Sequence, residues 1–447
     1  MSALTSQADI LPVASRTIRK LRRRIIPYIF LLYVIAYLDR VNVSYAQLNM
    51  GKSLGIAAAA FGLVSGIFFI GYFLFEIPSN AILYRVGARK WIARILVSWG
   101  AVAMATGFVQ SLNHLLIARF VLGLAEAGFF PGMVLYITLW FPAKEQARAF
   151  SQFMVAQVVA YIIGAPTGGW ILDHVHVGGL ESWRWVFILQ GLPAVIFGVV
   201  TFFYLTDRPR DARWLTDEER GWLEDQLARE RAEKQSRHKL GEWQTLLSPR
   251  ILHLTAIYLC IVLGIYGLNF FLPQIVKGLS TSYSNTTVGF LVAIPFVIGG
   301  IAMLVNGWHS DRTLERKFHV IVCTVTAAAG LFLIPFFRHD PLLAIVLLCV
   351  VSIGNFGYIS AFWALPQLVL TEAAAATGIA LINSVGNLGG FIGPYIVGAK
   401  ATESNVTQGL YLLAASFLVA TVLLVLLPTE KVKSAESPAA APGPVGG

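Results

Sequence analysis

Long apolar runs make up most of this sequence, and they leave it few possible folds. Each run is 20 to 30 residues long, and a helix of that length, rising ~1.5 Å per residue, crosses a hydrocarbon layer of about 30 Å. Because lipid offers the backbone no hydrogen-bond partners, such runs cross a membrane as helices. Only 13% of the residues are charged, compared with about 25% in soluble domains. We therefore expect an all-α integral membrane protein with 12 transmembrane helices, near residues 25–48, 58–84, 91–110, 113–140, 147–172, 184–206, 250–276, 286–309, 318–337, 341–370, 375–400 and 405–428.

A polar stretch in the middle of the chain divides these runs into two groups of six. The basic loops 85–90 and 307–312 occupy matching places in the two groups, which indicates a duplicated unit. The sequence therefore predicts two six-helix bundles. The expected organisation is a polar, basic cytoplasmic tail at 1–24, bundles at 25–206 and 250–428, a cytoplasmic linker at 207–249 and a disordered cytoplasmic tail at 429–447.

The linker carries the pattern of one short helix. Thr216 and Glu219 have the spacing of a capping box, and Leu223 and Leu227 continue an apolar stripe. We expect an amphipathic helix near 217–234. It either lies on the bundle or the membrane surface, or is fully solvated.

The positive charges indicate how the chain is oriented. With the N-terminus in the cytoplasm, 27 of the 34 Lys and Arg residues fall in inner segments and five in outer segments. This bias follows the positive-inside rule and predicts that both termini are cytoplasmic. The first run is too long for a cleaved secretory signal, so we expect a multi-pass protein of the cell (inner or plasma) membrane. Topology accounts for the net charge of +10 without a nucleic-acid partner.

The two remaining positive charges, Arg40 and Arg119, lie inside apolar runs, each with an acid nearby. Asp39 precedes Arg40, and Glu126 follows Arg119 by two helical turns. Charged groups at this depth are costly unless they are paired or face a wet cavity. A structural ion-pair network between helices, in which the two acids and two bases neutralise each other, is one explanation. The alternative is a transport site, in which the arginines bind a carboxylate and the acids carry protons, with Asp39 as the partner that orients Arg40.

Other polar residues in the spans are candidates for the same site. Each of them alone is also explained as a hydrogen bond between packed helices. The candidate binding residues are Tyr72, Gln157, Trp363, Asn383 and Asn387. Glu76, near an inner helix end, is interpreted as a cytoplasmic gate or as a packing partner of a basic loop residue.

Sequence signals for other chemistry are missing. We find no Walker sequence, metal-ligand cluster or nucleophile elbow, and Cys260, Cys323 and Cys349 lie in apolar runs without metal spacing. We therefore expect neither an enzyme nor a resident metal or cofactor, with protons as the coupling ion.

Several motifs resemble the anion:cation symporter family of the major facilitator superfamily. They are YLDRVN at 37–42, FEIPSN at 75–80, RVGAR at 85–89, RFVLGLAEAGFFPG at 119–132 and GNLGGFIGP at 386–394. The resemblance implies the major facilitator fold. It also implies protonation at Asp39 and Glu126, and substrate binding and coupling by Arg40 and Arg119. By the same resemblance Tyr72, Gln157, Trp363 and Asn387 are pocket positions.

The resemblance also suggests gating residues in the two basic loops, namely Arg85, Arg89, Asp311 and Arg312. The superfamily pattern Gly-x-x-x-Asp-Arg is intact only at 307–312. In the first half Tyr84 stands where the pattern has aspartate, which weakens the gating argument for that loop.

Together these features predict a monomeric, proton-coupled symporter that lies in the lipid bilayer and imports a small organic carboxylate. A proton-independent exchanger or facilitator and a non-transporting membrane sensor are the alternatives. Aromatic residues in the expected pocket favour an aromatic acid, whereas Gln157 and the asparagines favour a hydroxylated acid such as tartrate or a sugar acid.

Overall fold

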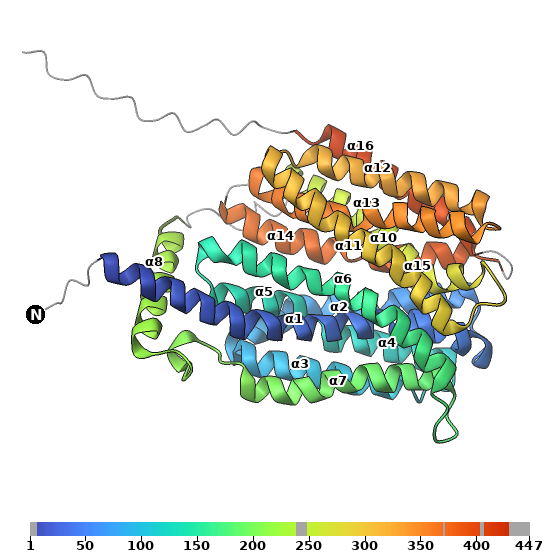
Figure 1. Cartoon of the computed structure of the whole chain (residues 1–447), viewed down its shortest axis with the longest axis horizontal. Helices are drawn as coiled ribbons and strands as arrows, with labels where there is room; N and C mark the ends of the chain where they lie inside the picture. The colour runs from blue at the N-terminus through green and yellow to red at the C-terminus, as the bar shows by residue number, and fades with distance from the viewer. Residues whose placement is uncertain (1–6, 238–247, 370–371, 403–405, 429–447) are drawn as a thin grey trace, which may run out of the picture.

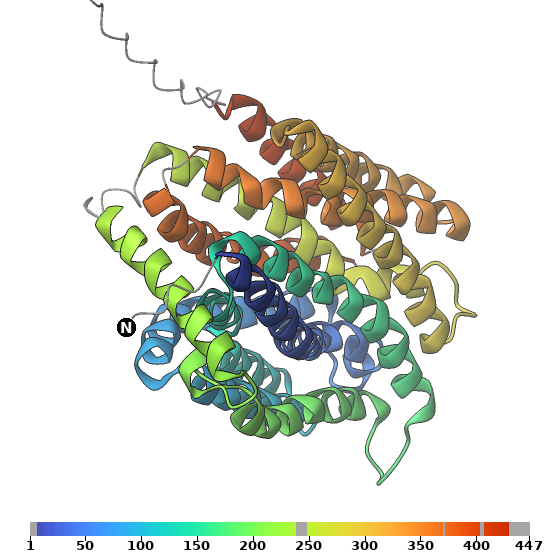
Figure 2. The same cartoon turned by 60° about the vertical axis from the view of Figure 1, so that its left-hand side comes forward.

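The structure is a computed structural model that describes residues 7–237, 248–369, 372–402 and 406–428. Its helices form two bundles that lie side by side with their axes roughly aligned (Figure 1). The view in Figure 2 separates them, with the N-terminal bundle in blue to green and the C-terminal bundle in yellow-green to red. The first bundle contains α1 (Gln7–Ser53), α2 (Ala58–Val86), α3 (Ala88–Thr106), α4 (Leu112–Glu126), α5 (Phe129–Trp140), α6 (Ala143–His174) and α7 (Ser182–Tyr204).

The linker contains η1 (Pro209–Asp211) and α8 (Asp217–Arg237), and the second bundle follows it. That bundle contains α10 (Pro249–Lys277), α11 (Asn285–Thr313), α12 (Lys317–Leu333), η2 (Ile334–Phe337), α13 (Pro341–Val369), α14 (Glu372–Gly386), α15 (Gly389–Lys400), η3 (Thr407–Gly409) and α16 (Leu410–Leu426).

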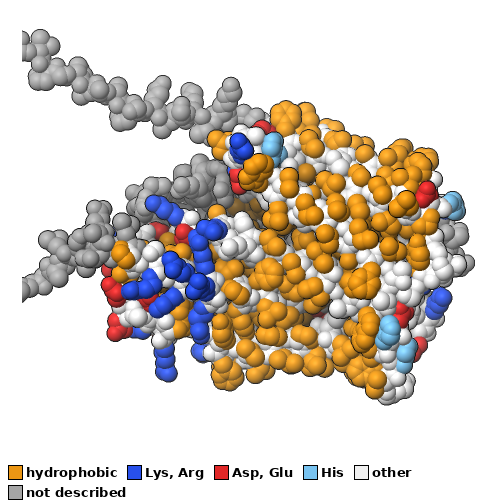
Figure 3. Space-filling view, in the orientation of Figure 1, with side chains coloured by type: hydrophobic (Ala, Val, Ile, Leu, Met, Phe, Trp, Pro, Cys, Tyr) orange, Lys and Arg blue, Asp and Glu red, His pale blue; other side chains and the backbone are white. Residues whose placement is uncertain are grey.

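These helices confirm the predicted all-α membrane architecture. Among the described residues, 11 segments are long and apolar enough to cross a membrane. The twelfth predicted span, 91–110, is α3, which packs against α7 and α4. Apolar side chains cover most of the face in Figure 3, and Lys and Arg gather at the end of the molecule where α8 lies. We call this end the α8 end.

A break in the predicted span 113–140 positions an acid at the centre of the first bundle. α4 ends at Glu126, and α5 begins at Phe129. Between them Gly128 adopts a φ of +87°, where a side chain would be strained and would collide with Ser79. The hydroxyl of Ser79 donates a 2.7 Å hydrogen bond to the freed carbonyl of Ala127. The local sequence therefore ends one helix at Glu126 without leaving that carbonyl unpaired.

The prediction that residues 1–24 form a tail is wrong for residues 7–24. They belong to α1, which continues beyond the expected span to Gln7. Ion pairs with distant acids stabilise this extension: Arg16 and Lys20 bind Glu219 at 3.0 and 2.7 Å, and Arg22 pairs with Glu145. The expected disordered tail at 429–447 lies outside the described residues.

The predicted linker helix is confirmed as α8, and it docks on the bundle. The backbone N–H of Thr216 donates to Glu219 at 3.0 Å, and the N–H of Glu219 donates to the Thr216 hydroxyl at 3.3 Å, as in a capping box. Leu223 and Leu227 are buried, and α8 packs against α1. The apolar stripe therefore faces protein, which excludes the fully solvated alternative.

The two bundles touch most closely away from the α8 end. The last turns of α6 meet the first turns of α11, where a side chain added at Gly169 or Gly289 would collide with the opposing backbone. The first turns of α2 meet the last turns of α15 in the same way at Gly62. These small residues let the backbones approach closely enough to hold the halves together at this end.

Candidate substrate site between the two bundles

One face of α1 forms the wall of a pocket between the bundles. Tyr33, Tyr37 and Arg40 recur every three or four residues, so they share one side of the helix. Across the pocket, Asn355, Ile359 and Trp363 recur in the same way on α13. Each half of the chain thus presents one helix face with polar side chains to the space between the halves.

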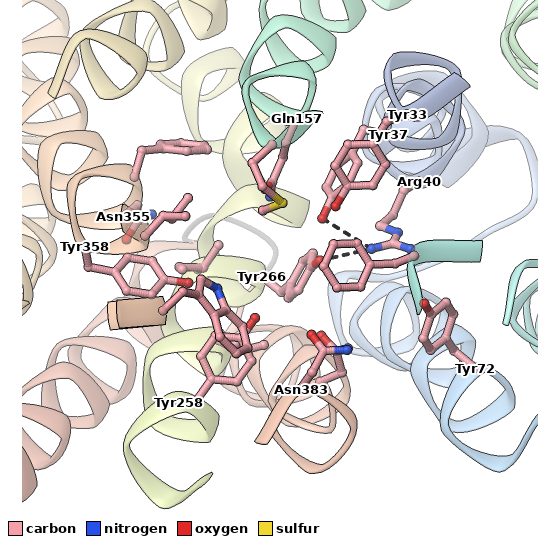
Figure 4. Close-up of a pocket in the computed structure, with 18 residues that line it drawn as sticks. Tyr33, Tyr37, Arg40, Tyr72, Gln157, Tyr258, Tyr266, Asn355, Tyr358 and Asn383 are labelled. Carbon is pink, nitrogen blue, oxygen red and sulfur yellow. Dashed lines mark hydrogen bonds between the residues drawn. The ribbon is translucent and has the colours of Figure 1, made fainter. Parts of the chain in front are cut away.

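The pocket collects most of the residues predicted from the sequence. It encloses about 670 Å³, part of it continuous with solvent. Of the seven predicted binding residues, six line it: Arg40, Tyr72, Gln157, Trp363, Asn383 and Asn387. Figure 4 shows Arg40 and Tyr72 on one side, with Tyr258 and Tyr358 on the other.

Arg40 is the only charged residue among those that line the pocket in the described part of the chain. Its guanidinium forms an ion pair with Glu126 and donates hydrogen bonds to the hydroxyls of Tyr266 at 3.3 Å and Tyr37 at 3.5 Å. Because Tyr266 belongs to α10, Arg40 connects the two bundles. The dashed lines in Figure 4 mark the two tyrosine contacts.

The expected pairing of Asp39 with Arg40 is wrong. Asp39 accepts a 2.7 Å hydrogen bond from the amide of Asn42, and its second carboxylate oxygen has no hydrogen-bond partner in the protein. The reason is helical geometry, since consecutive residues point about 100° apart and do not face each other. Arg40 instead reaches Glu126, which is 86 positions away in the sequence.

Arg119 is the predicted binding residue that does not line the pocket. Its side chain is fully buried, and its guanidinium lies 5.1 Å from the ring centre of Phe68. None of its three guanidinium nitrogens has a hydrogen-bond partner in the protein. Asp39 and Glu126 are the acids close enough to interact with its charge. The site therefore has a layer of ionisable groups behind Arg40 that consists of two acids and a second base.

Glu76 binds the opposite bundle rather than a basic loop residue. It is buried and accepts hydrogen bonds from the amide of Asn383, at 3.3 Å, and from the hydroxyl of Ser384. Its place inside an apolar helix, more than two turns before Arg85, keeps it away from the loop charges. Asn383 also lines the pocket, so one side chain touches both the pocket and this contact between the halves. The gating role of Glu76 stays a prediction.

The basic loops form ion pairs within their own halves. Arg89 pairs with Asp207 at 3.5 Å, and its backbone N–H donates to the same carboxylate at 2.8 Å. Asp311 pairs with Arg316 at 2.6 Å, and Arg312 lies over the ring of Trp308. Arg85 is exposed. Gating by Arg85, Arg89, Asp311 and Arg312 remains a prediction.

Sequence reasoning missed several polar residues that line the pocket. They are Tyr33, Tyr37, Tyr258, Tyr266, Tyr358 and Asn355. Tyrosines and a lone asparagine are common in apolar helices, so their presence alone was no signal. Their spacing did carry a signal. Tyr258 and Tyr266 are eight residues apart, as are Asn355 and Trp363, and residues at that spacing share a helix face.

Comparison with known proteins identifies the family. The model of the "Major Facilitator Superfamily" matches residues 29–394 of this chain. The chain belongs to the major facilitator superfamily. It is a transporter rather than an enzyme, because its relatives along nearly the full length are also transporters.

Three relatives that align with nearly the whole chain are named for different transport roles. A protein of Agrobacterium vitis named "Putative tartrate transporter" is 42% identical over 95% of this chain and 94% of its own length. The "Quinolone resistance transporter" of Acinetobacter baumannii is 40% identical over 91% and 93%. The "Inner membrane transport protein RhmT" of Escherichia coli is 35% identical over 93% and 96%.

Solved structures of this superfamily share the fold at low sequence identity. The inward-open xylose transporter XylE of Escherichia coli superposes with a TM-score of 0.73 at 14% identity, covering 92% of this chain and 97% of XylE. A D-xylose–proton symporter gives 0.72 at 14% identity, covering 91% and 98%. The two-bundle arrangement is thus that of the superfamily.

Proposed function

We propose that this transporter carries a small organic carboxylate together with protons, as an anion:cation symporter. The observation that carries the proposal is that Arg40 lines the pocket while its ion-pair partner Glu126 is fully buried behind it. One arginine is therefore shared between a place where an anion can bind and an acid that can bind a proton. The 42% identical relative named for tartrate supports a carboxylate cargo.

The shared arginine suggests how the two movements are coupled. An incoming carboxylate takes hydrogen bonds from the Arg40 guanidinium, which can hold it bidentately. Glu126 then loses its positive partner in a buried site, where a carboxylate favours the neutral, protonated form. Asp39, with one unpaired oxygen in the same layer, is a second acceptor for a proton. Anion binding and proton binding thereby favour each other.

The proposed orientation assigns the two ends of the molecule to the two sides of the membrane. Lys and Arg gather at the α8 end, and the positive-inside rule supports a cytoplasmic position for this end. We place the chain, as a monomer with both termini cytoplasmic, in the inner membrane. The close contacts at Gly169 and Gly289 then close the outer side of the pocket.

A second cargo is favoured by the wall of the pocket. Tyrosines, Phe130, Phe356 and Trp363 give it much aromatic surface. One relative is named for quinolone resistance, and quinolones are aromatic carboxylates. Export of such a compound, or exchange without protons, is the competing function.

Uptake into proteoliposomes separates these possibilities. We expect labelled carboxylate to accumulate against its gradient when the outside is more acidic, and accumulation to stop when a protonophore dissipates the gradient. Uptake that ignores the pH gradient indicates an exchanger or facilitator. Binding of a quinolone and of no small carboxylate indicates the competing cargo.

A further inference from the structure

Asn355 stands out among the pocket residues because its amide has no partner. The side chain is 1% exposed, and neither its nitrogen nor its oxygen forms a hydrogen bond within the protein. The other amides that line the pocket are more exposed or partnered; Asn383, for example, donates to Glu76. Buried amides in native proteins are almost always hydrogen-bonded, since an unpaired one destabilises the fold.

The position of Asn355 shows what could use this amide. It lies on the pocket face of α13, with Tyr358 and Ile359 one turn further on. Figure 4 shows it across the pocket from Arg40. A cargo whose carboxylate binds Arg40 therefore directs its other end toward the second bundle, where Asn355 and Tyr358 lie.

The charges in the pocket restrict that other end to a neutral polar group. Among the described residues that line the pocket, none besides Arg40 carries a charge. A second carboxylate near Asn355 would have no positive partner, whereas a hydroxyl both donates and accepts. The two free atoms of the amide match those two functions.

We propose that Asn355 binds a hydroxyl group of the cargo and makes the carrier selective for hydroxylated carboxylates. This inference rests on the proposed function and extends it to a substrate class. A site built to bind a hydroxyl rejects the analogue that lacks it, because the buried polar groups then stay unpaired.

The test compares hydroxylated acids with their deoxy counterparts in wild type and in Asn355→Leu. The pairs are gluconate with hexanoate, and 4-hydroxyphenylacetate with phenylacetate. We expect wild type to prefer one hydroxylated member by at least about 10-fold, and the variant to lose most of that preference. The readouts are ligand-induced melting shifts and competition against uptake of the preferred acid.

The stability of the cargo-free protein distinguishes this role from a structural one. Removing an unpaired amide should leave the melting temperature of Asn355→Leu unchanged or raise it. In the matched control Asn306→Leu the melting temperature should fall, because the Asn306 amide donates to the carbonyl of Gly357 at 2.8 Å. Where leucine is not accommodated, Asn355→Ala replaces it.

Two results would overturn the inference, and they differ in whether the proposed function survives. An unchanged preference ratio in the Asn355 variants, with carboxylates still transported, rejects the role of Asn355 and leaves the proposed function intact. If wild type binds and transports no acid of the panel, the proposed function itself fails, and the inference fails with it.

Discussion

Asp173 in the first bundle caps a helix of the second bundle through Thr286. One carboxylate oxygen accepts hydrogen bonds from the backbone N–H and the hydroxyl of Thr286, both at 2.7 Å. The other oxygen accepts the backbone N–H of Asn285 at 3.2 Å and its side-chain amide at 2.9 Å. A negative charge at the N-terminus of α11 also interacts favourably with the helix dipole. This contact holds the halves together at the end opposite α8.

Asp173→Asn should loosen that closed end. The substitution removes the charge and at least one acceptor. We expect the amides of residues 285–289 to exchange with deuterium about 10-fold faster or more, as estimated from the strength of charge-assisted hydrogen bonds. Hydrogen-exchange mass spectrometry in detergent or nanodiscs measures the change.

The control for this prediction is Asp340→Asn. Asp340 accepts the N–H of Leu343 at 3.1 Å and caps a helix of its own bundle. In Asp340→Asn, faster exchange should be confined to the first turn of α13. Equal effects of the two variants at residues 285–289 would show that Asp173 holds no special contact between the halves.

Arg40→Ala should weaken carboxylate binding by about 10- to 100-fold, which corresponds to the loss of a charge-assisted hydrogen bond. Arg40→Lys should recover little, because an ammonium cannot form the bidentate contact of a guanidinium. Melting-shift titrations and exchange assays measure the affinity. Arg23→Ala, at an exposed arginine of α1, serves as a matched loss of positive charge and should bind normally. Wild-type affinity in Arg40→Ala would exclude Arg40 from the site.

Glu126→Gln should separate binding from proton coupling. The amide has nearly the shape of the protonated acid, so binding and exchange of labelled for unlabelled anion should persist. Uphill uptake should fail, because glutamine can neither take up nor release the proton. If this variant still accumulates cargo with the pH dependence of wild type, the coupling scheme is wrong.

Asp39→Asn should also impair uphill uptake. The structure changes what we expect for binding, since Asp39 is held by Asn42 and does not orient Arg40. Binding should therefore be less affected than in Arg40→Ala. The same three assays of binding, exchange and accumulation measure the difference.

The docking of α8 should depend on acid pH through Glu219. Burial raises the pKa of this carboxyl, but hydrogen bonds from Lys20, Thr216 and Arg16 outweigh burial and hold the pKa below its usual value. A lowered pKa in the folded state means that the stabilisation is fully present above the ordinary pKa of glutamate. It is lost as the pH falls through the lowered value.

The protection of α8 amides, corrected for the intrinsic pH dependence of amide exchange, should therefore be high near pH 7 and fall only in acid, below the ordinary glutamate range of about 4.3. Glu219→Gln should lower this protection at neutral pH as well as in acid. Glu224→Gln, an exposed acid on the same helix, should behave like wild type. Acid dependence that survives in Glu219→Gln would assign the effect to another group.

Much of the site was predictable because charges inside apolar runs are rare. Asp39, Arg40, Arg119 and Glu126 were conspicuous for that reason, since each is costly in lipid without a partner or a cavity. The linker helix was predictable as well, because the capping box at Thr216 and the following apolar stripe are local patterns. Asn355 had no such signal, since one amide in an apolar helix also suits ordinary packing.

The sequence by itself determined that the chain crosses a membrane in two groups of six helices, because the lengths and order of apolar runs are local properties. Only the tertiary structure decided which charges pair. Arg40 meets Glu126, and Arg16 meets Glu219 across 203 positions. The directions of these side chains depend on how each helix is rotated and packed against helices distant in sequence. For the same reason Arg119 lies behind the pocket, Glu76 faces Asn383, and residues 7–24 continue α1.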